Sequence, residues 1–550
     1  MPSVTAKSST APETLRRLKE VLRQTSARLS NLSPKNRFGL SALAGGLNIL
    51  LFPVFSVNGL AWISLVPFLL SLHGEQRARR SLLYGFIAGS IFFLGSCYWI
   101  AIVLKKYGDL SWPTALLLLI VLTAFLSFFF ALFGLVFSYL SNRFPRGCFL
   151  LAPFVWVGTE YLRAHALTGF PWCLQGYALV DYSSISKVVA WTGVYGLSWI
   201  VLAGNCILVL LLTGRQGQVL YTLLILMGVL TLWPRFGDQG DSERIRPKNV
   251  RLVQPNISLD QEWSPTSKEQ LLDDLQDLSL QSDRSQTSSV EPVSLLVWPE
   301  TPAPFYLNHD REFRRRMQSL ARASDAYLVF GFVDFRVSKS AGAEPEEPSP
   351  FNSVAVLSPS GEFVSQYDKI HLVPFGEYIP YPSVFFFVDK ISTEAGNFSP
   401  GNHLVVSQLD GAERLGTFIC YESIIPDLVR KFTAAGAQLL VNVTNDGWFG
   451  DSPAPYQHLS MARLRAIENH RYLIRAANSG ISAVIDPEGR ILVSTRLNQR
   501  TVLEGTVKLY DDLTFYAKHG DLFAFSCVGA SLAGLVLAWR RRRQGDVLDS

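Results

Sequence analysis

The stretch Phe418-Ile419-Cys420-Tyr421-Glu422 decides the fold class of the more polar half of this chain. A β-branched and aromatic run over residues 416–419 predicts a strand, and an amphipathic stretch over residues 426–435 predicts a helix. A thiol therefore lies at a strand-to-helix corner, where a nucleophile is exposed beside free backbone N–H groups. Taken alone, Cys420 is equally well interpreted as a small buried hydrophobic residue.

The same alternation of short apolar runs and amphipathic stretches extends on both sides of Cys420. Strands are predicted over residues 249–253, 294–298, 327–332, 354–357, 416–419, 439–443 and 481–485. Helices are predicted over residues 267–278, 311–323, 426–435 and 456–469. This alternation is typical of a layered α/β domain, which we place at residues 247–510.

Two further motifs place charged side chains near the ends of predicted strands. In Val297-Trp298-Pro299-Glu300 a strand ends at a proline and a carboxylate follows, at the end of the sheet where α/β proteins bind ligands. Lys369 lies among apolar residues, and a buried ammonium group usually needs a carboxylate nearby. Taken singly, Glu300 and Lys369 are simpler to interpret as surface residues. Together with Cys420 they supply a base, a cation and a nucleophile to one domain.

Charged residues are distributed very unevenly along the 550 residues. Residues 41–235 contain 15 Asp, Glu, Lys or Arg, whereas residues 236–550 contain 70. Overall 17% of the residues are charged, against roughly a quarter in an ordinary soluble protein. This excludes a purely soluble protein, a disordered chain and a small disulfide-rich domain. The net charge of +5 gives no argument for nucleic-acid binding.

Long runs without charge predict a membrane domain. They cover residues 39–55, 57–72, 81–104, 111–140, 147–159, 188–213, 217–233 and 522–539. A spanning helix needs roughly 20 apolar residues. We therefore predict seven spans in residues 39–235, the α/β domain, and an eighth span in residues 520–540. Buried core helices are the alternative for the shortest runs.

Lysine and arginine predict the orientation of these spans. They are concentrated in residues 1–38 and in every second loop. Arg540 to Arg543 lie at the boundary between the last predicted span and the final segment 541–550. Basic loops face the cytoplasm. Both termini are therefore expected in the cytoplasm and the α/β domain outside it. Residues 168–172, Thr-Gly-Phe-Pro-Trp, fall in an outer loop, and the preceding Glu160 and Arg163 form either a functional or a structural pair.

The order Trp298-Pro299-Glu300, then Asp-Lys-Ile-His-Leu-Val-Pro-Phe-Gly-Glu at residues 368–377, then Cys420-Tyr421-Glu422 resembles the nitrilase, or carbon–nitrogen hydrolase, superfamily. The resemblance covers about residues 248–510 and implies an α-β-β-α sandwich with a Glu300–Lys369–Cys420 triad. Within this superfamily, the chain resembles the lipoprotein N-acyltransferases of the bacterial inner membrane. This closer resemblance rests on residues 442–450, Asn-Val-Thr-Asn-Asp-Gly-Trp-Phe-Gly, on the outer loop and on the predicted spans.

This resemblance implies transfer of a fatty acyl chain from a phospholipid to the α-amino group of the diacylglyceryl-modified N-terminal cysteine of an apolipoprotein. Cys420 would carry the acyl chain as a thioester in a ping-pong mechanism. Glu300 would be the general base, while Lys369 and the Tyr421 backbone N–H would bind the oxyanion. No metal or cofactor is implied, and the sequence has no metal-ligand spacing or nucleotide-binding loop.

Several further residues match the pattern of this family. Glu377, Tyr421 and Glu422 would support the triad. The two carboxylates would orient Lys369 or shift the pKa of the base, although structural ion pairing explains them equally well. Trp263 and Trp448 would shape the substrate pocket or simply pack. Three phenylalanines within residues 379–388, Phe385 to Phe387, form either a lid that dips into the membrane or part of the core.

Two other functions use the same residues. A membrane-tethered amidase of this superfamily would hydrolyse a small molecule with the same triad and water as the acceptor. A receptor or transporter would use the outer domain only to bind a ligand, but such a protein has no need of all three triad residues.

Overall fold

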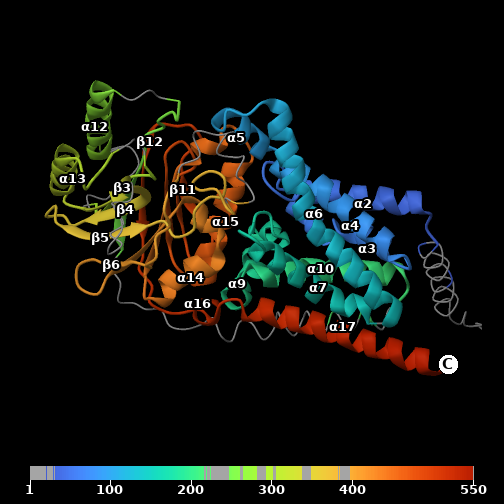
Figure 1. Cartoon of the computed structure of the whole chain (residues 1–550). Coiled ribbons are helices and arrows are strands. Elements are labelled where there is room, and N and C mark those ends of the chain that lie inside the picture. Colours follow the sequence, from blue (N-terminus) through green and yellow to red (C-terminus); the bar gives the residue numbers. More distant parts are fainter. Residues whose placement is uncertain are drawn as a thin grey trace, which may run out of the picture.

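The computed structural model describes residues 20, 29, 31–145, 147–215, 218–219, 223, 247–260, 264–281, 293–301, 305–336, 348–381, 383 and 397–548. These residues form a helical part and a part built on two sheets, which lie end to end (Figure 1). The helical part contains residues 31–215 and the last helix of the chain.

The helical part consists of apolar helices of very different lengths. They are α2 (Pro34–Ile49), η1 (Asn58–Trp62), α3 (Val66–Leu72), α4 (Ala78–Cys97), α5 (Trp99–Tyr107), α6 (Trp112–Arg143), α7 (Cys148–His165), η2 (Gln175–Leu179), α8 (Ser183–Ser186), α9 (Val189–Thr192), α10 (Val194–Leu212) and α17 (Leu522–Leu548). Among the described residues, four segments are long and apolar enough to span a membrane: Ala78–Cys97, Trp112–Arg143, Val194–Leu212 and Leu522–Arg541.

Of the eight predicted spans, the described residues therefore support four by length and composition. The run at residues 57–72 is divided between η1 and α3, because Pro67 begins a new helix rather than continuing one. The run at residues 81–104 divides between α4 and α5 next to Tyr98. The run at residues 217–233 lies largely outside the described residues.

Small residues allow the long helices α4 and α6 to pack closely. A Cβ atom on Gly85 would lie 2.3 Å from the Phe130 carbonyl oxygen, and one on Gly134 would lie 2.5 Å from that of Ser81. Lipid tails are as apolar as leucine, so helices in a membrane associate through such close backbone contact. Glycine at these positions thus holds the two helices together.

The predicted α/β domain is confirmed, and it contains two six-stranded sheets. The first has the order β12-β1-β2-β3-β4-β5 and the second has the order β11-β10-β9-β8-β7-β6. The strands are β1 (Lys248–Gln254), β2 (Leu295–Val297), β3 (Tyr327–Arg336), β4 (Ser349–Leu357), β5 (Phe363–Asp368), β6 (Val406–Gln408), β7 (Arg414–Ile419), β8 (Leu439–Thr444), β9 (Leu473–Ala477), β10 (Ala483–Ile485), β11 (Ile491–Ser494) and β12 (Thr501–Val507).

Helices cover the outer face of each sheet, as the resemblance implies. Helices α12 (Pro265–Leu280) and α13 (Arg311–Ser324) cover the first sheet, and α14 (Pro426–Ala434) and α15 (Ala454–Asn469) cover the second (Figure 1). In β2, Leu295 and Val297 face the core between the sheets, while Leu296 faces the core under α12 and α13. Both faces of the strand are buried, so its sequence is continuously apolar.

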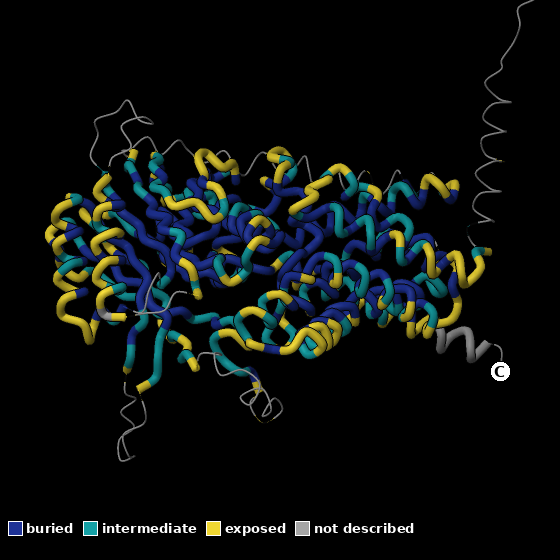
Figure 2. Tube along the Cα trace, turned by 90° about the horizontal axis from the view of Figure 1, so that it is seen from above, coloured by how far each residue is buried: buried dark blue, intermediate teal, exposed yellow. Residues whose placement is uncertain are grey.

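Helix α15 joins the sandwich to the helical part. Its Met461 and Leu464 belong to the same hydrophobic core as the membrane helices, and buried residues continue from one part into the other (Figure 2). From the same helix, Gln457 bonds Trp172 (2.6 Å) and donates to the carbonyl oxygen of Ser96 (3.2 Å). The short helix α16 (Phe515–His519) then leads into α17.

Candidate active site

Glu300 follows β2 and is almost completely buried. Its Oε1 accepts hydrogen bonds from Asn352 Nδ2 (2.7 Å) and Lys369 Nζ (3.4 Å). Its Oε2 accepts from the backbone N–H of Asn445, just after β8 (2.8 Å). The carboxylate is thus fixed by groups from both sheets.

Lys369 follows β5, and only 1% of its surface is exposed. Its Nζ lies 2.8 Å from Glu377 Oε1 and 3.4 Å from Glu300 Oε1. Burial alone would lower the pKa of Lys369, but the charges of Glu377 and Glu300 outweigh burial and raise it. The lysine is therefore a permanent cation shared by two carboxylates.

Cys420 begins η4 (Cys420–Ile424) directly after β7 and is buried. Its φ of 49° lies in the left-handed region, which a non-glycine residue adopts at a cost of about 1–2 kcal/mol. Burial and the charge of Glu300 raise the pKa of the Cys420 thiol, while Lys369 opposes them only in part. The thiol therefore lies within the field of both partners and is protonated at neutral pH.

Asn352 is a member of this cluster that the sequence analysis missed. It lies on β4, and its Nδ2 donates to Glu300 Oε1 (2.7 Å) and to Glu377 Oε1 (2.8 Å). Glu377 Oε2 in turn accepts from the N–H of Val373 (2.8 Å). Its signal in the sequence was weak, because Asn352 lies between Phe351 and Ser353, before the β-branched part of the strand.

Glu422 connects the Cys420 corner to the segment after β5. Its oxygens accept from Tyr367 Oη (2.7 Å), from the N–H groups of Ile370 (2.7 Å) and His371 (3.0 Å), and from the Ile419 N–H (2.8 Å). Burial raises the pKa of Glu422. Of the two roles considered for Glu422, orienting the Lys369 segment fits these contacts. The neighbouring Tyr421 is buried and stacks on His371, with ring centroids 5.9 Å apart.

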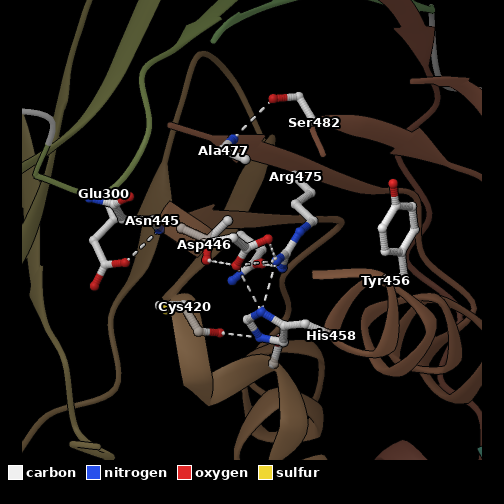
Figure 3. Close-up of polar contacts among 12 residues, drawn as sticks. Glu300, Cys420, Asn445, Asp446, Tyr456, His458, Arg475, Ala477 and Ser482 are labelled. Atoms are coloured by element: carbon white, nitrogen blue, oxygen red, sulfur yellow. Dashed lines mark hydrogen bonds and ion pairs between the residues drawn. The ribbon is translucent and has the colours of Figure 1, made fainter. Parts of the chain in front are cut away.

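A second polar network, also missed in the sequence analysis, lies behind Cys420 (Figure 3). His458 Nδ1 lies 3.0 Å from Asp446 Oδ1, and Arg475 Nη2 donates to Asp446 Oδ2 (2.7 Å). On the other side of the ring, His458 Nε2 lies 3.2 Å from the Cys420 carbonyl oxygen. These three side chains are 0% exposed. Burial alone would raise the pKa of Asp446, but Arg475 and His458 outweigh it and lower this pKa.

The outer loop at residues 168–172 covers this network from the side of the membrane helices. Trp172 is buried and stacks on His458, with ring centroids 5.8 Å apart. Arg163 Nη1 donates to the carbonyl oxygens of Phe170 (2.9 Å) and Trp172 (2.8 Å), and Glu160 accepts from the Gln175 N–H (2.7 Å). Arg163 thus holds the loop, and Glu160 holds the start of η2, which follows it.

The two tryptophans predicted to line the pocket have different outcomes. Trp448 is 44% exposed and contacts Tyr107, at the end of α5, with ring centroids 4.9 Å apart. Trp263 lies outside the described residues, as do Phe385 to Phe387. Among the described residues, no group of three or more His, Cys, Asp or Glu side chains could hold a metal ion.

The chain is similar to curated proteins along almost its whole length. It is 37% identical to the apolipoprotein N-acyltransferase of Geobacter metallireducens, over 92% of this chain and 96% of that protein. The chain belongs to the apolipoprotein N-acyltransferase family. It is also 31% identical to the Chlorobaculum tepidum apolipoprotein N-acyltransferase, again over 92% of this chain and 96% of that protein.

The separate parts of the chain match separate family patterns. Residues 44–207 match the apolipoprotein N-acyltransferase N-terminal domain, and residues 249–511 match the carbon-nitrogen hydrolase family. Among solved structures, an amidase from Nesterenkonia sp. is 22% identical, with a TM-score of 0.35, over 50% of this chain and 92% of that one. The resemblance seen in the sequence motifs is confirmed by the two family patterns.

Proposed function

We propose that this enzyme transfers a fatty acyl chain from a phospholipid to the α-amino group of the lipidated N-terminal cysteine of an apolipoprotein. The observation that carries the proposal is that Glu300, Lys369 and Cys420 are all buried just after strands, with Lys369 Nζ 3.4 Å from Glu300 Oε1 and the charges of both acting on the Cys420 thiol. Membership of the family supports the same substrates. Both substrates carry acyl chains, which gives a physical reason for the apolar helices joined to the sandwich.

The first half-reaction acylates Cys420. Glu300 takes the thiol proton as Sγ attacks the ester carbonyl carbon of the phospholipid. Lys369 and the Tyr421 backbone N–H bind the oxyanion that forms. When the carbon–oxygen bond breaks, the proton on Glu300 passes to the leaving alkoxide. A lysophospholipid departs, and the acyl chain remains on Cys420 as a thioester.

The second half-reaction transfers the chain to the apolipoprotein. The α-amino nitrogen attacks the thioester carbonyl carbon, and Glu300 takes a proton from the amine. The same two donors bind the second oxyanion. The carbon–sulfur bond then breaks, the proton returns to Cys420, and an amide leaves. Glu377, Asn352 and Glu422 act as positioning residues that hold Glu300 and Lys369 in place.

The proposed location is the bacterial inner membrane, with the sandwich on the periplasmic side and both termini in the cytoplasm. The basic loops support this orientation. Trp448 and Tyr107 meet where the sandwich adjoins the end of α5, and aromatic side chains favour the membrane–water interface. We place the entrance for the acyl chains there.

Intact-mass measurement tests the proposal. The purified protein is incubated with phospholipid beside Cys420→Ala, and a lipoprotein peptide is then added. We expect the mass of one acyl chain on the wild type, its release by hydroxylamine or by the peptide, and no adduct on the variant. An acyl adduct that survives in Cys420→Ala, or none on the wild type with any phospholipid, would contradict the mechanism.

A further inference from the structure

The carbonyl oxygen of Cys420 and the N–H of Tyr421 belong to one peptide group. In a planar trans peptide these two bonds point in opposite directions. A partner that holds the carbonyl oxygen therefore also fixes the direction of the N–H. The Cys420 carbonyl oxygen lies 3.2 Å from His458 Nε2, on the side of the strand-to-helix corner that faces α15 (Figure 3).

The contacts of His458 indicate which nitrogen carries the hydrogen. Burial and the charge of Arg475 lower the pKa of His458, so the ring is neutral and has one N–H. The carbonyl oxygen of Cys420 only accepts, and Arg475 Nη2, 2.9 Å from Nδ1, only donates. Nδ1 also lies 3.0 Å from Asp446 Oδ1, but this carboxylate already accepts from Arg475 Nη2 (2.7 Å) and Thr444 Oγ1 (3.0 Å). The Cys420 carbonyl oxygen therefore determines the tautomer, with the hydrogen on Nε2 and Nδ1 accepting from Arg475. The Ser423 hydroxyl, 2.6 Å from Nε2, lies on the same side.

His458 is held rigidly enough to act as a brace. Arg475, itself held by Asp446 (2.7 Å), fixes one edge of the ring by donating to Nδ1 (2.9 Å), and Trp172 of the outer loop stacks on its face at 5.8 Å. Trp172 is itself tied to α15 through Gln457 (2.6 Å) and to α7 through Arg163 (2.8 Å). The helical part therefore contributes to holding the ring.

The backbone at Cys420 needs such a brace. With φ at 49°, the residue is in a conformation that the surrounding structure must impose. Glu422 Oε2 holds the Ile419 N–H on one side of Cys420 (2.8 Å), and His458 holds the Cys420 carbonyl oxygen on the other. Without the second contact, the Cys420–Tyr421 peptide group is freer to rotate.

We propose that His458 is a positioning residue that fixes the Cys420–Tyr421 peptide group, so that the Tyr421 N–H points at the oxyanion of both half-reactions. The inference rests on the proposed function, because the oxyanion donor belongs to that mechanism. It also implies that the outer loop helps to orient the Tyr421 N–H, because Trp172 of that loop packs against the His458 ring.

Three variants of His458 test the brace. Gln can place an N–H near the position of Nε2, Asn reaches only the position of Nδ1, and Leu fills space without a hydrogen bond. His309→Leu is the matched control, since His309 Nε2 also bonds a backbone carbonyl, that of Phe335 (3.0 Å), on an exposed surface. Two rates are measured by intact mass: acylation by phospholipid in a single turnover, and alkylation of Cys420 by iodoacetamide, which forms no oxyanion.

We expect acylation to fall about 10- to 100-fold in His458→Asn and His458→Leu and to recover largely in His458→Gln. The loss is smaller than the roughly 100- to 1000-fold cost of removing an oxyanion donor, because the N–H is misaligned and not removed. Alkylation should stay within about twofold in all variants, because it depends on the thiolate. Equal acylation rates in His458→Leu and the wild type would contradict the positioning role of His458 but leave the proposed function intact. So would a parallel loss of acylation and alkylation in all three variants, which indicates general disruption. A wild type that forms no acyl adduct would overturn both the brace and the proposed function.

Discussion

The charges around Cys420 favour a neutral thiol over a thiolate. Lys369 is the cation of the cluster, but it is shared with Glu377 and Glu300, and Glu377 is the nearer carboxylate. The local charge is therefore negative when both carboxylates are ionised, and burial adds to the cost of a thiolate. Such a site needs a base that removes the proton as the nucleophile attacks, and Glu300 suits this role.

Replacing Glu300 by Gln should separate the reactivity of the thiol from turnover. Loss of the negative charge lowers the pKa of Cys420, so the thiolate fraction at any pH below that pKa rises. We expect faster alkylation by iodoacetamide at pH 8 in Glu300→Gln, while acylation falls at least about 100-fold without the general base. Intact-mass kinetics measure both rates.

The exposed Glu362, in the turn before β5, provides the control Glu362→Gln, which should match the wild type. In the wild type, the alkylation rate should continue to rise through pH 9, because the pKa of the thiol is raised. If Glu300→Gln slowed alkylation and acylation equally, the charge interaction argued for Glu300 would be wrong.

Among the helices, the junction of α9 and α10 depends on one glycine. Gly193 has φ of 62°, and a Cβ atom there would lie 2.6 Å from the ring of Tyr516 on α16. The Tyr516 ring is fully buried, and its hydroxyl donates to Asp521 (3.1 Å). The ring therefore has little room to move. This contact positions the end of the sandwich on the membrane helices.

Gly193→Ala should destabilise the protein more than the same change at Gly411, which also has φ of 62° but no atom within 4 Å of an added Cβ. Backbone strain at a positive φ costs each variant about 1–3 kcal/mol, and Gly193, with ψ of −174°, lies in a region that essentially only glycine adopts. The clash with Tyr516 adds about 1–3 kcal/mol in Gly193→Ala alone. Melting temperatures in detergent measure the difference, and equal shifts for the two variants would contradict the argument.

In the assembled chain, the sandwich and the helical part share one hydrophobic core through α15. Polar contacts cross the same joint, for example from Gln457 to Trp172 and Ser96. A continuous core of this kind holds the catalytic cluster at a set position relative to the membrane helices. Under the proposed function, lipid substrates held by these helices would reach Cys420 without a large domain movement.

The proposed orientation predicts which surface sites a membrane-impermeant maleimide reaches in intact cells. All six native cysteines are buried, so added cysteines report separately. Ser360→Cys, exposed on the sandwich, should be labelled from the periplasm. Gln76→Cys, exposed in a predicted cytoplasmic loop, should react only after the inner membrane is opened. Labelling of Gln76→Cys but not Ser360→Cys in intact cells would contradict the proposed orientation.

The strand patterns around the three proposed catalytic residues could be predicted because they are local. Val297-Trp298-Pro299-Glu300 and the run before Cys420 form β2 and β7, and both residues lie just beyond their strands. Short strands with weak patterns were missed, namely β5, β6, β9, β11 and β12. Strand β11 is exposed along its whole length, so burial left little signal in its sequence.

The number of spanning helices could not be predicted from apolar runs alone. A run without charges satisfies composition, but length and continuity depend on where each helix ends. Proline at the start of α3 and the break near Tyr98 divide two of the runs. The break near Tyr98 still leaves α4 long enough to span, whereas η1 and α3 are each too short. The described structure supports four spans by length and composition.

Local sequence was sufficient for the α/β class, the apolar helices, and Glu300, Lys369 and Cys420 as candidates, because periodicity and strand ends are properties of neighbouring residues. The partners of these residues required the tertiary structure. Asn352 reaches Glu300 across the first sheet, and His458 reaches Cys420 from α15. Trp172 and Gln457 bond across 285 residues of sequence. A buried polar group needs a partner, but strand order and helix packing determine which distant residue supplies it.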